Sequence, residues 1–165
     1  NWMNQQYLLK LPEEEYFRMI DDVIQKGDYH DQDPGKIRQA AEILKTRLVT
    51  LSDLNQKLGL FFEENPEIKD LQAIEVLKEE NSKTVLKEFL QQAENLDQLT
   101  SENLGQLVKS VHKTTGIKGR GLWMPLRCAI TREVSGPELP AMLDFFGGEK
   151  CLHLIRQTLE NPSLN

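Results

Sequence analysis

Residues 110–140 read SVHKTTGIKGRGLWMPLRCAITREVSGPELP, and they interrupt a chain that is otherwise patterned as helices. Glycines, cations, a tryptophan and three prolines gather here without helical regularity. Residues 105–132, which we call the basic segment, hold six Lys or Arg and no Asp or Glu, a net +6 in a chain of net −6. This local reversal of charge predicts a contact surface for a polyanion. On composition alone, a basic loop that balances acidic helices explains it equally well.

The sequence outside this stretch carries apolar residues at helical spacing, with local signals where each helix begins. Asp33 followed by Pro34 is typical of a helix start, and Thr50 with Asp53, like Thr100 with Asn103, resembles a capping box. No stretch alternates as a strand does, so we expect an all-α fold. Helices are predicted over about 13–26, 34–49, 50–62, 67–80, 82–93, 103–111, 139–146 and 149–160, with another starting at 126.

The sequence offers no pattern typical of catalysis. A phosphate-binding G-x-x-x-x-G-K-S/T loop and an H-E-x-x-H metal pair are both absent, and Cys128 and Cys151 have no partner at metal-ligand spacing. We therefore expect reduced thiols in a cytoplasmic protein, with no membrane span and no metal. A chain that starts at Asn1 without an initiator Met suggests a piece of a longer protein.

The basic segment carries chemistry suited to binding RNA. Its lysines and arginines supply positive charge for phosphate, and arginine can also pair with a base edge through two hydrogen bonds. Trp123 is a candidate stacking platform for an unpaired base, although a core position between Leu122 and Met124 is the more common use of such a residue. Pro125 favours a non-helical Met124, so we expect the next helix to start at Leu126.

Three segments together resemble the C-terminal, anticodon-binding region of bacterial-type glutamyl-tRNA synthetases, which are class I aminoacyl-tRNA synthetases. Residues 2–7, WMNQQY, are similar to the family's W-M-N-x-x-Y. Residues 116–127, GIKGRGLWMPLR, are similar to its G-x-K-G-K-x-L-F-x-P-L/I-R, followed by AIT at 129–131. The third segment comprises GPELP at 136–140 and GGEK at 147–150.

The resemblance implies an all-helical cage of two subdomains that reads the anticodon of glutamate tRNA. In the family, ATP and Mg²⁺ are used by a separate N-terminal catalytic domain, whose H-I-G-H-like and K-M-S-K-S-like signatures are absent here. We therefore expect this chain to bind tRNA as a monomer, without cofactor or catalysis of its own. The expected divisions are residues 1–27, the end of a stem-contact region with a leading helix, then 28–66 and 67–165, the two anticodon-binding subdomains.

Particular residues follow from the same resemblance. The family's arginine that contacts an anticodon base falls on Arg47, and the arginine of its P-L-R motif falls on Arg127. Lys118 and Arg120 are expected to hold the RNA backbone. The family's G-P-E-L corner, expected near the last anticodon base, falls on Gly136, Pro137, Glu138 and Leu139.

The family usually has Phe where this chain has Trp123, which favours a core position for that side chain. The alternative function is a helical protein-interaction module, in which acidic faces and apolar stripes dock a partner chain. That alternative gives no reason for an acid-free segment with six cations.

Overall fold

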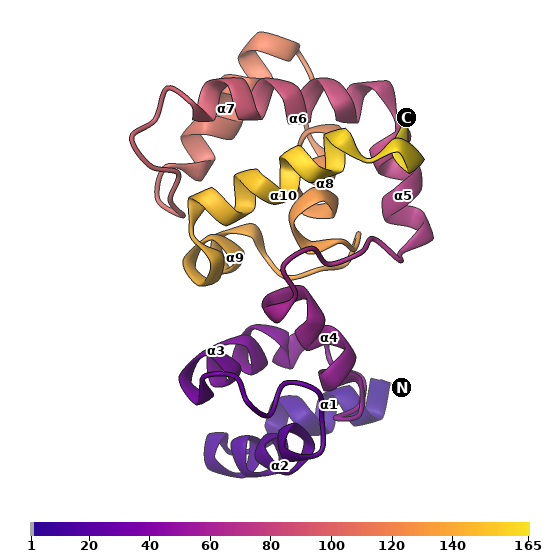
Figure 1. Cartoon of the computed structure of the whole chain (residues 1–165), viewed down its shortest axis with the longest axis vertical. Coiled ribbons are helices and arrows are strands. Elements are labelled where there is room, and N and C mark those ends of the chain that lie inside the picture. Colours follow the sequence, from indigo (N-terminus) through magenta and orange to yellow (C-terminus); the bar gives the residue numbers. More distant parts are fainter. Residues whose placement is uncertain (1) are drawn as a thin grey trace. The chain divides into compact units, whose positions relative to one another are not determined.

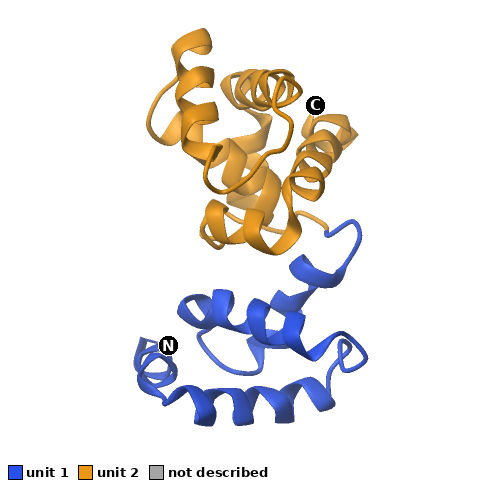
Figure 2. Ribbon diagram, turned by 90° about the vertical axis from the view of Figure 1, so that its left-hand side faces the viewer, with its two compact units in different colours: residues 1–66 blue, residues 67–165 orange. Residues whose placement is uncertain are grey.

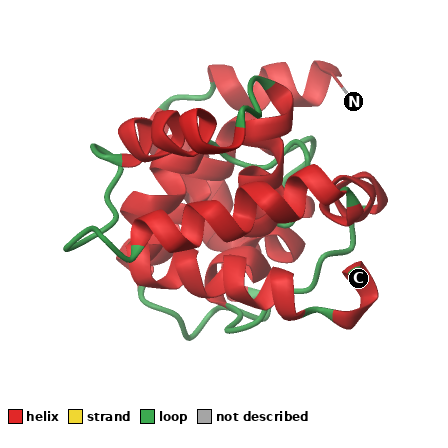
Figure 3. Cartoon of the chain, turned by 90° about the horizontal axis from the view of Figure 1, so that it is seen from above, coloured by secondary structure: helices red, strands yellow, loops and turns green. Residues whose placement is uncertain are grey.

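The computed structural model describes residues 2–165, and every regular element in that range is a helix (Figures 1 and 3). The prediction of an all-α fold is confirmed. The chain divides into two compact units, Asn1–Pro66 (unit 1) and Glu67–Asn165 (unit 2), which Figure 2 colours separately. Each unit has its own apolar core and is described here by itself.

Unit 1 is built from four α-helices and a short 3₁₀ helix. They are α1 (Trp2–Lys10), α2 (Glu13–Gln25), α3 (Pro34–Leu44), the 3₁₀ helix η1 (Lys45–Arg47) and α4 (Asp53–Phe62). Its core includes Ile20, Leu54 and Leu58, all fully buried. The ring of Tyr16 is also fully buried, and its hydroxyl donates to the carbonyl oxygen of Ala41 at 2.8 Å, which joins α2 to α3.

The elements of unit 2 are α5 (Leu71–Lys78), α6 (Glu80–Ala93), α7 (Leu104–Thr115), α8 (Arg120–Thr131), α9 (Leu139–Phe146), α10 (Gly148–Glu160) and the 3₁₀ helix η2 (Pro162–Leu164) (Figure 1). Helices α7, α8 and α10 all pack against α6, whose Leu86 and Phe89 are fully buried.

The predicted helix starts depend on local hydrogen bonds that the structure contains. The carboxylate of Asp33 accepts from the Lys36 N–H at 2.9 Å, and Pro34 is the first residue of α3. Thr100 and Asn103 bond each other reciprocally, at 2.8 and 3.3 Å, just before α7. The Thr50 N–H donates to Asp53 at 2.9 Å, and α4 begins at Asp53 itself.

Several predicted boundaries differ from the structure, and α1 was not predicted. Helix α4 begins at Asp53 rather than 50, α6 begins at Glu80 rather than 82, and α7 extends to Thr115 rather than ending at 111. Helix α5 begins at Leu71 rather than near residue 67, because Asp70 caps it by accepting from the Gln72 N–H at 2.9 Å. Lys45 and Arg47 lie in the 3₁₀ helix η1 rather than in the last turn of the preceding α-helix. Helix α1 was not predicted, because most of its large apolar side chains are exposed and leave no buried stripe to recognise.

The largest correction concerns α8. We expected a helix from Leu126, but α8 begins at Arg120 and contains Pro125. The basic segment is therefore largely helical, since α7 runs to Thr115. The buried face of α8 explains why the helix crosses the proline, because residues at i, i+3, i+4, i+7 and i+8 all face the core. They are Leu122, Pro125, Leu126, Ala129 and Ile130.

Both thiols lie in the core of unit 2. Cys128 is in α8 and Cys151 in α10, and neither side chain is exposed. Burial raises the pKa of each thiol to about 12. Within residues 2–165, no helix is long and apolar enough to cross a membrane, and no cluster of His, Cys, Asp or Glu is arranged to hold a metal ion.

Candidate nucleic-acid interface

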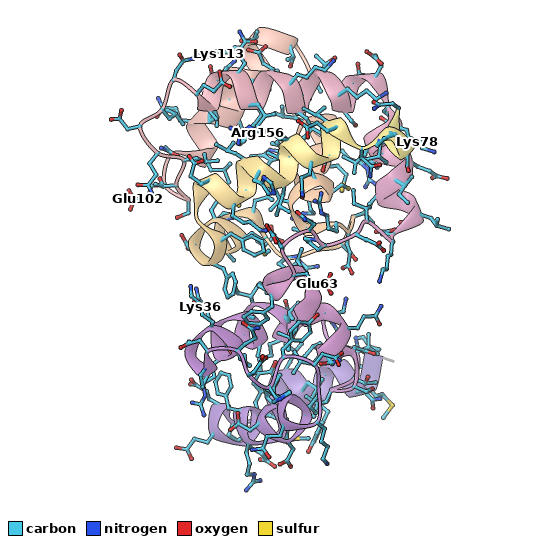
Figure 4. The ribbon with its side chains drawn as sticks, in the orientation of Figure 1. Lys36, Glu63, Lys78, Glu102, Lys113 and Arg156 are labelled. Carbon is cyan, nitrogen blue, oxygen red and sulfur yellow. The ribbon has the colours of Figure 1, made fainter. Side chains whose placement is uncertain are left out.

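The first part of the basic segment lies on α7. Lys109 and Lys113 are four residues apart on this helix, so they share one face, and both are exposed (Figure 4 labels Lys113). Helix α7 ends at Gly116, whose φ of 73° gives the left-handed conformation in which glycine is favoured. The chain then turns directly towards α8.

The start of α8 carries positive charge where a helix disfavours it. Lys118 is exposed just before the helix, Gly119 turns the chain with a φ of 59°, and Arg120 is the exposed first helical residue. The first turn holds no acidic residue. The N-terminal end of a helix is partially positive, so a cation there costs about 0.3–1 kcal/mol. Helix stability therefore does not explain Lys118 and Arg120, and their charges add to the positive end of the helix, where an anion would be favoured.

Arg127 lies two turns further along α8 and is fixed by an ion pair. Its guanidinium donates to the Glu138 carboxylate at 2.8 Å, and its side chain is 25% exposed. Glu138 stands immediately before α9, which begins at Leu139. The pair therefore holds the arginine in one direction while leaving it in contact with solvent.

The corner at residues 136–139 is mostly buried. A Cβ added at Gly136 would collide with the side chain of Thr131, so only glycine fits there. The side chains of Pro137 and Leu139 are also buried, which leaves Glu138 as the exposed side chain of this corner. A ligand at the corner would therefore meet Glu138 and backbone groups.

Arg132 is not a surface cation, contrary to the expectation for the basic segment. Its side chain is buried, and its guanidinium donates to the Ala129 carbonyl oxygen and to the Thr158 hydroxyl, both at 2.7 Å. Burial lowers the pKa of Arg132 to about 10. This arginine joins the end of α8 to α10, so it is unsuited to phosphate binding.

Arg47 belongs to unit 1, where η1 carries it half-buried. The side-chain amide of Gln5, on α1, donates to the Thr46 carbonyl oxygen at 2.8 Å. The ammonium of Lys45 lies 4.7 Å from the centre of the Tyr16 ring, a distance typical of a cation–π contact. These contacts fix the segment that carries Arg47.

The expectation that Trp123 is a core residue is wrong, because its side chain is 42% exposed. Once α8 is helical from Arg120, the apolar face passes through Leu122 and Leu126, and Trp123 is turned by about 100° from Leu122. Arg120 precedes Trp123 by three residues and Arg127 follows it by four. Those spacings place all three on one face of α8.

Five sequence-predicted residues therefore present side chains that a ligand can meet: Lys118, Arg120, Arg127 and Glu138 in unit 2, and Arg47 in unit 1. Gly136, Pro137 and Leu139 shape the corner from within the core. The sequence favours a core position for Trp123, whereas the structure exposes it. The signal that would have placed it on the surface is its spacing from the two arginines.

The helical fold and the cationic surface of α7 and α8 define an all-α domain suited to a polyanionic ligand. The sequence pattern of the family described as "Anticodon binding domain" matches residues 6–159. The chain therefore belongs to the anticodon binding domain family.

Curated relatives are consistent with this assignment. The chain is 31% identical to a glutamate–tRNA ligase of Latilactobacillus sakei and 33% identical to one of Listeria monocytogenes. These matches cover 96% and 97% of this chain but only 33% and 34% of the relatives, in their C-terminal third. The chain thus spans about a third of the length of the relatives it matches.

Solved structures share the fold. A glutamate tRNA ligase from Elizabethkingia meningosepticum superposes with a TM-score of 0.69 over 97% of this chain and 31% of that one, at 22% identity. A glutamate–tRNA synthetase from Elizabethkingia anophelis gives 0.62 over the same shares, at 23% identity.

Proposed function

We propose that this chain is the tRNA anticodon-recognition module of a glutamate–tRNA ligase. One observation carries the proposal: four cations of the basic segment, Lys109, Lys113, Lys118 and Arg120, are exposed in succession over α7 and the start of α8. The chain outside the basic segment has a net charge of −12, which repels phosphate and would favour this surface for contact with the RNA backbone.

In the proposed mechanism, recognition depends on positioning. The exposed lysines and Arg120 hold the backbone of the anticodon arm of glutamate tRNA, and the anticodon bases unstack. Arg47 and Arg127 then hydrogen-bond to base edges, for which a fixed guanidinium is well suited. Glu138 keeps Arg127 in the required direction through their 2.8 Å hydrogen bond.

The ligase reaction belongs to the longer protein in this proposal. That protein joins glutamate to tRNA with ATP and Mg²⁺, using a catalytic domain that this chain does not contain. The chain itself acts in the cytoplasm as a monomer and contributes tRNA binding without a catalytic residue.

The decisive experiment is an anisotropy titration of the chain with labelled anticodon-arm hairpins of glutamate tRNA at several salt concentrations. Four phosphate contacts predict that log K falls with log[salt] at a slope of about −3 to −4. Lys118→Ala or Arg120→Ala should each lower the magnitude of that slope by about one. Lys78→Ala and Arg156→Ala are matched controls, because both residues are exposed in unit 2 outside the basic segment (Figure 4).

Altered anticodons test the two reading arginines. Arg47→Ala or Arg127→Ala should cost about 1–3 kcal/mol with the wild-type anticodon and much less with a mismatched one. An equal loss with both anticodons would assign the residue to backbone contact. Binding that is weak and unaffected by salt would contradict the proposal as a whole.

A second candidate, a protein-interaction module, is favoured by α1. Trp2 and Met3 on this helix are 72% and 73% exposed, and Tyr7 is also exposed. An exposed apolar face of this kind is common at protein contacts. The same titration separates the two functions, because a module that only docks proteins would not discriminate between anticodons.

A further inference from the structure

Trp123 is an exposed residue of α8 that has no role in the proposed contacts to the RNA backbone and base edges. Most of the other large apolar residues of α8 face the core, and Leu122 and Leu126 are 5% and 0% exposed. Trp123 lies beside them with 42% of its side chain in water. Exposure of a single aromatic residue is common and does not by itself indicate a binding site. The residues around Trp123 must therefore provide the evidence for a function.

Those surroundings are cationic. Arg120 and Arg127 lie on the same face of α8, on either side of Trp123 along the helix. Arg120 is exposed, and Arg127 is oriented by its hydrogen bond to Glu138. The exposed indole therefore lies between one accessible guanidinium and one of fixed direction.

This arrangement fits an unpaired nucleobase better than a protein side chain. Every base has a flat aromatic face that can stack on an indole, and each base is joined to phosphates that an arginine can bind. A base within a duplex keeps both faces stacked on its neighbours, so the surface would distinguish a loop from a double strand. An apolar protein partner would have to desolvate the two guanidinium groups.

We propose that Trp123 is a stacking platform for one unpaired RNA base and that Arg120 binds a phosphate adjoining that base. The proposal rests on the proposed function and adds a residue that contacts a base face rather than a base edge. Stacking is indifferent to base identity. Trp123 thus contributes affinity and holds the loop open, while discrimination stays with the arginines.

The first test is fluorescence. The chain has two tryptophans, so Trp2→Phe leaves Trp123 as the sole indole. This variant is titrated with an RNA hairpin carrying the anticodon stem and loop, and separately with a blunt RNA duplex of equal length. Stacking predicts that the hairpin quenches the emission of Trp123 and that the duplex does not.

The second test is affinity. Trp123→Ala should weaken hairpin binding by about 5- to 150-fold, the range measured for stacking of one base, and Trp123→Phe should restore most of the loss. The salt slope should stay unchanged in both variants, whereas Arg120→Ala lowers it. Trp2→Ala is the matched control for loss of an exposed indole. Thermal unfolding of each variant checks that the fold is retained.

The outcomes separate this inference from the function on which it rests. If Arg120→Ala weakens binding but Trp123→Ala does not and emission is constant, stacking is wrong and the proposed function stands. Equal quenching by hairpin and duplex would also overturn stacking, because a duplex presents no free base face along its length. If no RNA binds at low salt, the proposed function fails and this inference fails with it.

Discussion

Arg132 holds the C-terminal end of α8 against α10 through its buried guanidinium. It is the only non-glycine residue among 2–165 with a positive φ, 64°, so the chain accepts local backbone strain at this position. The guanidinium donates to the Thr158 hydroxyl at 2.7 Å and to the Gln157 side-chain oxygen at 3.3 Å, both on α10. Hydrogen bonds from a charged donor are among the stronger ones, and these offset the cost of burying the charge.

We expect Arg132→Ala to lower the free energy of unfolding of unit 2 by about 2–4 kcal/mol, because partners on α8 and α10 lose a buried donor. Arg132→Lys keeps a charge but lacks the planar fork, so its loss should be intermediate. Urea denaturation followed by circular dichroism measures both. Arg156→Ala, at an exposed position of α10, should change stability by less than about 0.5 kcal/mol. A loss no greater than that control would show that Arg132 does not hold the helices together.

At the scale of single helices, the N-capping aspartates of α3 and α5 differ in the number of hydrogen bonds that they accept. Asp33 caps α3 through a bond to Lys36, three residues away. Asp70 caps α5 in the same manner, but its second carboxylate oxygen also accepts from the Val134 N–H at 2.9 Å. Asp70 therefore fixes the beginning of α5 and also the loop between α8 and α9.

This difference predicts unequal effects of the same substitution. Asparagine is as good an N-cap as aspartate, so Asp33→Asn should be nearly neutral. Asp70→Asn keeps the cap but loses one acceptor, so it should cost about 0.5–1.5 kcal/mol. Asp33→Ala and Asp70→Ala remove the caps as well, and the second should again cost more. Chemical denaturation of each unit checks the order, and equal losses for the two Asn variants would show that the bond to Val134 contributes nothing.

The helices α3 and α8 illustrate which elements could be predicted from the sequence. The start of α3 was predictable because its determinants, Asp33 and Pro34, are adjacent in the chain. Helix α8 was not, because Gly121 and Pro125 both disfavour a helix and only packing against distant residues of unit 2 overrides them. The positive charge of the candidate site could be counted from the sequence. The burial of Arg132 could not, because its partners on α10, Gln157 and Thr158, lie more than twenty residues further along.

At the scale of the whole molecule, the two units bury different ionisable groups whose pKa values are raised. Unit 2 holds both thiols, whose pKa burial raises to about 12. Unit 1 holds Tyr16, whose pKa is raised by burial and by the charge of Glu42. The two units should therefore respond differently to alkaline conditions.

We expect the free energy of unfolding of unit 2 to be constant below about pH 9 and to fall as the pH rises from there. In that range the thiols ionise in the unfolded chain, near their ordinary pKa of 9.0, but stay protonated in the folded one. The free energy is measured by urea denaturation between pH 7 and 10. The sequence of unit 2 contains no tyrosine, and Arg132, whose pKa burial lowers to about 10, is present in both the parent protein and the cysteine variant, so its titration cancels when the two are compared. The double variant Cys128→Ala, Cys151→Ala should be less stable throughout but show a smaller decline. An equal decline in both proteins would contradict this assignment.

The burial of both native thiols also allows the separation of the two units to be followed with dyes attached to introduced cysteines. A cysteine introduced at an exposed position would be the reactive thiol at neutral pH, since Cys128 and Cys151 are buried and protonated. One such cysteine in place of Lys36 and another in place of Lys78 would put one dye on each unit (Figure 4). Energy transfer between the dyes would then follow, molecule by molecule, whether the units change their separation when RNA arrives.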